Sequence, residues 1–174
     1  EFHPRLPLTP EAMAADAAVC IEVGAAELHI HPRGKDLRES LAAVDTTVGI
    51  VRAACPGTLI GVSTGAWIEK DVQRTRACIS SWSVLPDYAS VNLSEDDAPD
   101  VMNILRSKGV GIEAGLATVA DAERFVALAD HPKVFRIGRG DLPARMTAAG
   151  GPAATGAFGT QTAGGLRRAK ASCR

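Results

Sequence analysis

Short apolar segments alternate along this chain with longer segments that carry the pattern of amphipathic helices. The apolar segments have the length and residue types of strands, and they lie at 26–31, 59–64, 88–93, 110–114 and 133–137. Helices are predicted at about 10–23, 41–54, 71–82, 98–108 and 120–129. Strands that alternate with helices in this way predict a parallel sheet with right-handed crossovers.

Two folds share this alternation, the TIM barrel and the open doubly wound sheet. Polar residues stand at or near the C-terminal ends of the predicted strands, namely His29, His31, Ser63, Thr64, Asn92 and Glu113. In a barrel these ends converge on one mouth. No G-x-G-x-x-G motif follows a strand, which counts against a dinucleotide-binding sheet. We therefore predict an α/β fold of the TIM (β/α)8 barrel type, incomplete because the chain holds only about five parallel strands.

The sequence His29-Ile30-His31 is the sharpest chemical feature of the chain. Side chains alternate along a strand, so the two imidazoles share a face about 6.6 Å apart and can reach one metal ion from the same side. Zinc takes histidine nitrogens readily, and a catalytic zinc keeps one position open. The alternative is a pair of histidines that only hydrogen-bond within the structure.

Glu113 lies in the apolar strand 110–114, where a carboxylate is unusual unless it is paired or bound to a metal. It is a candidate metal ligand or acid-base group. The alternative is a structural ion pair, for example with Arg136, which also lies in an apolar strand.

Other polar residues near the strand ends are candidates for binding a substrate. Ser63 and Thr64 offer two hydroxyl groups, and Asn92 offers both a donor and an acceptor. Arg33 follows the histidines and has the charge to pair with an anion. The alternative for Ser63 and Thr64 is that they only form a turn. Asn92 could instead anchor a loop, and Arg33 could be a solvated surface charge.

Composition sets the broad class. Hydrophobic residues make up 46% and charged residues 22%, which is typical of a soluble globular protein. A net charge of -1 offers no basic field for nucleic acid or an anionic membrane, and no apolar run approaches the ~20 residues of a bilayer span. The four cysteines form no C-x-x-C pair, and without a secretion signal we expect reduced thiols and a cytoplasmic protein.

The C-terminal part differs from the rest. From residue 138 onward the chain has six Lys or Arg and one acid, with eight Gly and nine Ala in 37 residues. Such a segment buries too little apolar surface to offset the entropy of ordering it. We predict a partial barrel domain over 1–142 and a weakly structured Gly/Ala/Arg-rich tail over 143–174.

Several segments resemble, in order, those of the beta-keto acid cleavage enzymes, a family typified by 3-keto-5-aminohexanoate cleavage enzyme. They are Pro7–Glu11, Gly24–Ala26 running into Leu28–Arg33, Val62–Gly65, Ala89–Leu93 and Ile112–Leu116. The resemblance covers about residues 4–137 and is closest to a shorter branch of the family.

The resemblance implies a TIM barrel with a divalent metal, usually zinc. It implies a reaction of a small beta-keto acid with acetyl-CoA that gives acetoacetate and a new acyl-CoA. His29 and His31 match two metal-binding histidines, and Ser63 matches a substrate-binding serine. Asn92 falls near the family's substrate, and Glu113 matches a glutamate that acts in the site.

The chain also departs from the family pattern. The family's first strand should precede residue 4, and the chain resembles only strands two to six of the barrel. The family's final strand carries Arg-x-Gly-Leu-Glu-Asp, whose Glu is the third metal ligand and whose Asp is a base. The echo of this motif at 136–141 has Gly140 in place of that Glu. We therefore expect weak or absent turnover by this chain, and self-association through open strand edges into a homo-oligomer.

Two other functions stay open. An amidohydrolase-like metal hydrolase also opens with H-x-H on a barrel strand, but it normally needs later histidines, and here only His131 follows. The other is a non-catalytic barrel fragment, which the missing third ligand favours.

Overall fold

The computed structural model describes residues 5–128, 134–139 and 169–172. The described elements, in chain order, are α1 Pro10–Glu22, β1 Ala25–Ile30, the 3-10 helix η1 Leu41–Ala43, α2 Val44–Ala54, β2 Leu59–Ser63, α3 Val72–Ser81, β3 Tyr88–Asn92, α4 Ala98–Ser107, β4 Gly111–Leu116, α5 Val119–Ala127, β5 Arg136–Arg139 and β6 Ala169–Ser172. Helix and strand alternate from α1 to β5, as the sequence pattern predicts.

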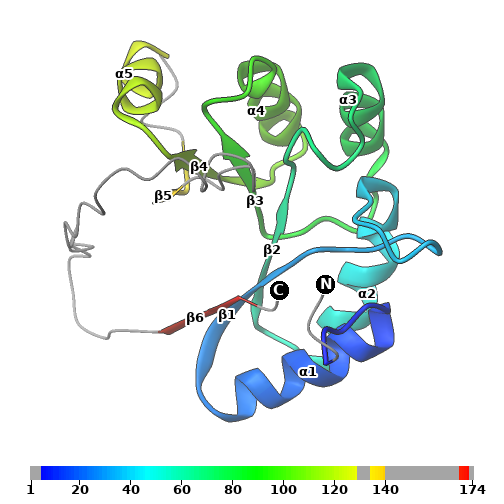
Figure 1. Ribbon diagram of the computed structural model, residues 1–174. Coiled ribbons are helices and arrows are strands. Elements are labelled where there is room, and N and C mark those ends of the chain that lie inside the picture. Colours follow the sequence, from blue (N-terminus) through cyan, green and yellow to red (C-terminus); the bar gives the residue numbers. More distant parts are fainter. Residues whose placement is uncertain (1–4, 129–133, 140–168, 173–174) are drawn as a thin grey trace.

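The strands form one sheet in the order β5-β4-β3-β2-β1-β6, and every neighbouring pair is parallel. Figure 1 shows the sheet curling, with the helices along one side of it. The arrangement is an incomplete TIM-type barrel, and the prediction of successive parallel strands with helices outside is confirmed. Strand β5 begins at Arg136, three residues later than predicted.

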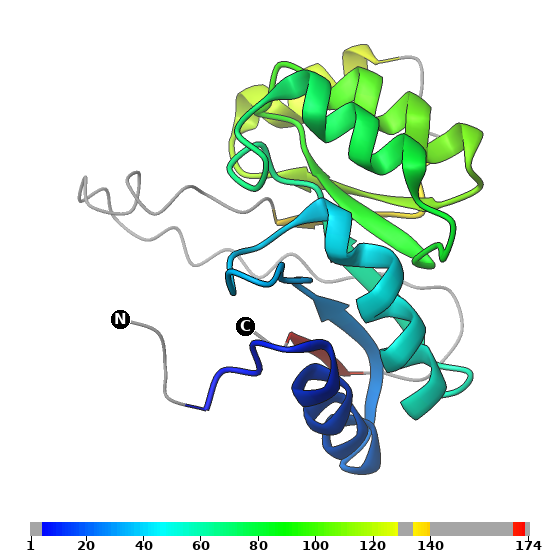
Figure 2. The same cartoon turned by 90° about the vertical axis from the view of Figure 1, so that its right-hand side faces the viewer.

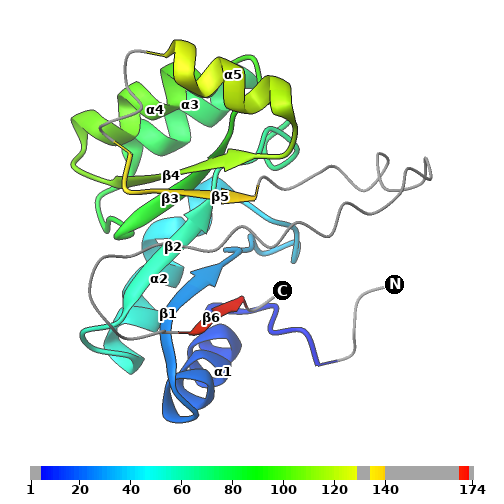
Figure 3. The same ribbon diagram turned by 90° about the vertical axis from the view of Figure 1, so that its left-hand side faces the viewer.

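Strand β6 comes from the segment that the composition predicts to be weakly structured. It pairs with β1, with Leu28 opposite Ala171 and His29 opposite Ser172. Figure 3 shows it on the side of β1 away from β2. The remaining residues of the predicted tail lie outside the described residues.

The apolar core lies between the sheet and its helices, whose arrangement Figure 2 shows from a second side. Alternate strand residues face the helices and are buried there, namely Leu28, Ile30, Ile60, Val62, Ala89, Val91, Ile112 and Ala114. Helix α2 packs against them through Val44, Val48 and Val51, which recur at helical spacing on its buried face.

The opposite face of the sheet is polar, because strand residues alternate between the two faces. The ladder aligns His29 with Gly61, Ser63 with Ser90, and Ser90 with Glu113. The next pair along the same row is Glu113 with Arg136. A row of polar groups therefore crosses the inner face of the sheet from β2 to β5, and His29 of β1 lies in the neighbouring row, opposite Gly61.

Local signals fix where the helices begin. The Thr9 hydroxyl accepts a hydrogen bond from the Ala12 amide at the start of α1, and Pro10 occupies the first turn. Thr118 and Asp121 form a capping box at the start of α5. Gly24, with φ 104°, ends the α1 region in a conformation that only glycine adopts without strain.

No helix of the described residues is long and apolar enough to cross a membrane.

Gly61 makes room for the ring of Tyr88. A Cβ added at Gly61 would lie 2.1 Å from two ring carbons of Tyr88, which is itself fully buried. The Tyr88 hydroxyl donates to the Leu28 carbonyl at 3.3 Å, so the ring bridges three strands across the space that Gly61 leaves.

We expect Gly61→Ala to lower the free energy of unfolding by about 1–3 kcal/mol, because the buried ring has to move. Gly49→Ala is the matched control. Its Cβ would meet only Val84, at 3.9 Å, and alanine favours a helix by up to ~1 kcal/mol over glycine. Urea denaturation of the two variants measures both effects, and equal stabilities would show that Tyr88 is free to shift.

Candidate active site

His29 is in β1 and His31 follows directly after the strand, and the two side chains lie side by side at the C-terminal end of the sheet. Their ring centroids are 5.3 Å apart, and the rings are tilted by 57°. His29 is buried at 7% exposure, and the His31 side chain is 14% exposed. The imidazoles are therefore close enough to act on one bound group from the same side.

Glu113 of β4 lies beside His29. Its Oε2 is 4.0 Å from the His29 Nδ1 and accepts a short hydrogen bond from the Ser90 hydroxyl. Its Oε1 is 2.8 Å from the Arg136 Nε. Gly138 leaves the space for this carboxylate, since a Cβ there would lie 3.0 Å from Oε1. Glu113 is thus ion-paired with Arg136 and also lies next to His29.

Arg136 joins two strands at opposite sides of the described half-barrel. Its NH1 group is 2.6 and 2.7 Å from the two carboxylate oxygens of Glu27 on β1. The guanidinium carbon lies 4.1 Å from the centroid of the Tyr88 ring, in cation–π contact. Burial raises the pKa of Tyr88, so this residue remains a neutral phenol.

The predicted substrate-binding residues of β2 and β3 differ in what they contact. The Ser63 hydroxyl accepts from the Gly65 amide at 3.4 Å, and the Asn92 side chain donates to Glu95 at 3.0 Å. The Thr64 hydroxyl donates to the Ser90 carbonyl at 2.8 Å, which ties β2 to β3.

The loop after β1 turns back on itself. Arg33 donates from NH1 to the Leu37 carbonyl at 2.8 Å, and backbone bonds join Gly34 to Arg38 and Ser40 to Pro32. Leu37 takes a left-handed conformation, with φ 63°, within this turn. Arg33 is therefore engaged with its own loop, close to the histidines.

Glu39 returns along this loop to His31. Its Oε2 lies 3.3 Å from the His31 Nδ1 and accepts a hydrogen bond from the Trp67 indole at 3.2 Å. Its Oε1 is 3.9 Å from the Arg33 NH2. The neighbouring His31 imidazole is the main cause that holds the pKa of Glu39 below its usual range, against the opposing effect of burial.

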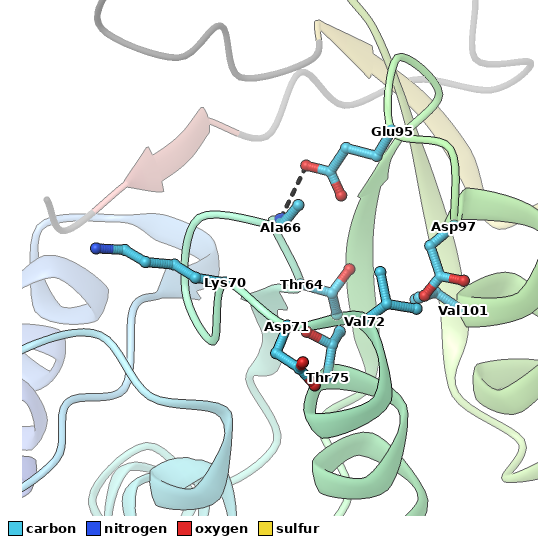
Figure 4. Close-up of a pocket in the computed structure, with 9 residues that line it drawn as sticks. All are labelled: Thr64, Ala66, Lys70, Asp71, Val72, Thr75, Glu95, Asp97 and Val101. Carbon is cyan, nitrogen blue, oxygen red and sulfur yellow. Dashed lines mark hydrogen bonds between the residues drawn. The ribbon is translucent and has the colours of Figure 1, made fainter.

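An open pocket lies beside these strand ends, between the starts of α3 and α4 (Figure 4). It is lined by Thr64, Ala66, Lys70, Asp71, Val72, Thr75, Glu95, Asp97 and Val101. Several of its acids already have partners. Glu95 accepts from the Ala66 amide at 3.0 Å, Asp71 caps α3, and Asp97 pairs with Arg76.

Sequence reasoning missed several residues of this site. Glu27 is one for which a signal existed, since it precedes His29 by two positions and so shares its face. By the same alternation, Tyr88 and Ser90 lie on the same face of β3 as Asn92. Glu39 and Trp67 come from loops, where no period applies.

The donor set suits a divalent metal in part. Neutral imidazoles are good zinc ligands, and the Glu39 carboxylate lies 3.3 Å from the His31 Nδ1, which leaves the Nε2 of that ring to bind. Within residues 5–128, 134–139 and 169–172, however, no three His, Cys, Asp or Glu residues are placed to hold one ion together. The described residues thus supply a pair of ligands.

Comparison with known proteins agrees with the fold and the residue pattern. The family model for beta-keto acid cleavage enzyme matches residues 1–148. A solved structure titled as a ternary complex of ObcA with a C4-CoA adduct and oxalate is similar, with a TM-score of 0.60 and 20% sequence identity over 75% of this chain. This chain spans 35% of that protein. An L-Ala-D/L-Glu epimerase matches at 14% identity over 74% of this chain and 53% of its own, with a TM-score of 0.33.

Proposed function

Because this chain belongs to the beta-keto acid cleavage enzyme family, we propose that its site serves metal-dependent cleavage of a beta-keto acid with acetyl-CoA. The products would be acetoacetate and a new acyl-CoA. The observation that carries the proposal is the placement of His29, His31 and Glu113 together on the inner face of the sheet. The CoA adduct named for the ObcA structure supports a CoA thioester as one substrate.

His29 and His31 would hold the metal, which we propose to be zinc, because their imidazoles share one side of the sheet end. A bound divalent ion supplies Lewis acidity, which stabilises the enolate that beta-keto acid cleavage requires. Neutral imidazole ligands leave such an ion most of its charge.

Glu113 is the residue we assign to proton transfer. Its distance of 4.0 Å from the His29 Nδ1 is too long for a hydrogen bond, so that contact does not fix Oε2. Ser90 donates to Oε2, while Arg136 orients the carboxylate through Oε1. The carboxylate is thus held at the site with a defined orientation and reaches the inner face of the sheet.

We assign substrate binding to Ser63 and Asn92, which end β2 and β3 on the side of the histidines. The contacts of Thr64 and Arg33 suit a supporting function, because Thr64 ties two strands together and Arg33 holds the loop of His31. All four side chains are buried. A ligand that binds here would therefore lose its contacts with water and gain contacts with polar groups that the protein holds in place.

We further propose that turnover by this chain is slow or absent, and that it associates with itself. A metal held by two imidazoles lacks the third protein ligand usual for catalytic zinc. Strand β5 ends the sheet of the described residues at one edge, and Phe135 just before it and Ile137 within it are 53% and 56% exposed. An uncovered edge of this kind favours pairing with a second copy.

The test is to incubate the purified chain with zinc, acetyl-CoA and a panel of beta-keto acids while following acetoacetate and bound zinc. We expect the chain to bind zinc, His29→Ala and His31→Ala to lose it, and acetoacetate to form far below ordinary enzymatic rates. His131→Ala serves as a histidine control. Zinc binding that survives both site substitutions would refute the proposed metal site, and hydrolysis of amide substrates would favour a metal hydrolase instead.

A further inference from the structure

The loop that follows β1 brings a carboxylate back to the strand it leaves. Glu39 pairs with Arg33 as an isolated antiparallel bridge, and the Gly34–Arg38 and Pro32–Ser40 backbone bonds close the turn around it. The loop is also fixed at its far end, where the Leu41 amide donates to Glu69 at 2.8 Å. The position of Glu39 is therefore set by backbone bonds on both sides.

The Glu39 carboxylate is held by side chains as well. The Trp67 indole donates to Oε2, and the Trp67 ring lies over Gly65, where an added Cβ would come within 2.2 Å of the ring. The Arg33 guanidinium lies 3.9 Å from Oε1. These neighbours leave the Glu39 carboxylate facing His31, with 25% of its side chain exposed.

Within that geometry the contact with His31 is specific to one ring nitrogen. Glu39 Oε2 lies 3.3 Å from Nδ1, so a proton on Nδ1 is favoured and Nε2 is left with a lone pair. Metal-bound histidines commonly donate their other ring nitrogen to a carboxylate, which fixes the ring and raises its basicity.

We propose that Glu39 is a positioning residue for His31, which it holds in the tautomer and orientation that present Nε2 to a divalent metal. This inference rests on the proposed metal site. Glu39 itself does not take the place of a third ligand, since no group of three ligands exists among the described residues.

The experiment compares Glu39→Gln and Glu39→Leu with the unmodified chain, and uses Glu123→Gln, an exposed carboxylate on α5, as control. One readout needs no metal: nitrogen NMR of the neutral His31 ring reports which nitrogen carries the proton. The other is the affinity for Zn²⁺ or Co²⁺ alone, measured by competition with a chelator.

We expect the neutral His31 ring to carry its proton on Nδ1 in the unmodified chain and to shift toward Nε2 in Glu39→Leu. We expect both Glu39 variants to bind metal roughly 10–100-fold more weakly, with Glu123→Gln unchanged. A His31 ring protonated on Nε2 in the unmodified chain, or the same tautomer in Glu39→Leu, would overturn the inference. A chain that shifts tautomer as expected but binds no metal supports the positioning and refutes the proposed metal site instead.

Discussion

Replacing Arg136 with methionine is expected to lower the free energy of unfolding by about 3 kcal/mol. The substitution keeps an apolar stem against Tyr88 but leaves Glu27 and Glu113 facing each other without a cation. Removing one partner of a buried ion pair typically costs roughly 3–5 kcal/mol, because the other charge stays buried without compensation. The lower end applies here, since a quarter of the Arg136 side chain is exposed.

Arg74→Met is the matched control for this prediction. Arg74 pairs with Glu69 at the same 2.6 Å separation, but the Arg74 side chain is 67% exposed, and the buried Glu69 carboxylate keeps the Leu41 amide as a donor without it. Pairs that involve an exposed cation contribute roughly 0–1 kcal/mol, so this variant should be nearly as stable as the unmodified chain. Urea unfolding followed by circular dichroism measures both. Adding Glu27→Gln to Arg136→Met should recover part of the loss, and equal losses in the Arg74 and Arg136 variants would contradict the bridging function.

The fold could be predicted from the sequence wherever hydrophobic periodicity decides the structure. The first four predicted strands coincide with β1 to β4 to within two residues at each end. Their outward side chains are apolar and buried against helices, so packing and periodicity give the same answer.

The edges of the sheet are where the sequence signal fails. Val134 and Phe135 look like the start of a strand, but the ladder with β4 begins at Arg136, and the Phe135 ring instead stacks on Tyr88 at 5.8 Å. Strand β6 follows a Gly- and Ala-rich stretch with no period, and its pairing depends on an open edge of β1 that no local pattern reveals.

The candidate site divides in the same way. His29 and His31 are found from strand alternation alone, and the Glu113–Arg136 pair follows from two charges in neighbouring apolar strands. Glu39 could not be found, because its approach to His31 depends on a loop that closes through backbone bonds and a left-handed Leu37. Such a loop has many alternatives of similar length, and only tertiary contacts choose among them.

The Glu113→Gln variant is expected to lose proton transfer almost entirely. The proposed cleavage begins with removal of a proton next to the ketone of the substrate, and this step can be observed without acetyl-CoA. With the zinc-loaded chain in D₂O, NMR should show deuterium entering that position of a beta-keto acid faster than in buffer. Loss of a general base typically slows a reaction about 10²–10⁴-fold, which would return exchange to the background.

Glu27→Gln separates this function from the ion pair. Glu27 and Glu113 both bind the Arg136 guanidinium, but only Glu113 lies beside His29. A carboxylate that acted only by neutralising Arg136 would make the two variants alike. If Glu113 transfers the proton, Glu27→Gln keeps most of the exchange while Glu113→Gln loses it, and zinc affinity stays similar in both. Exchange that persists in Glu113→Gln would assign the base to another group and leave Glu113 with the structural function that its ion pair with Arg136 already defines.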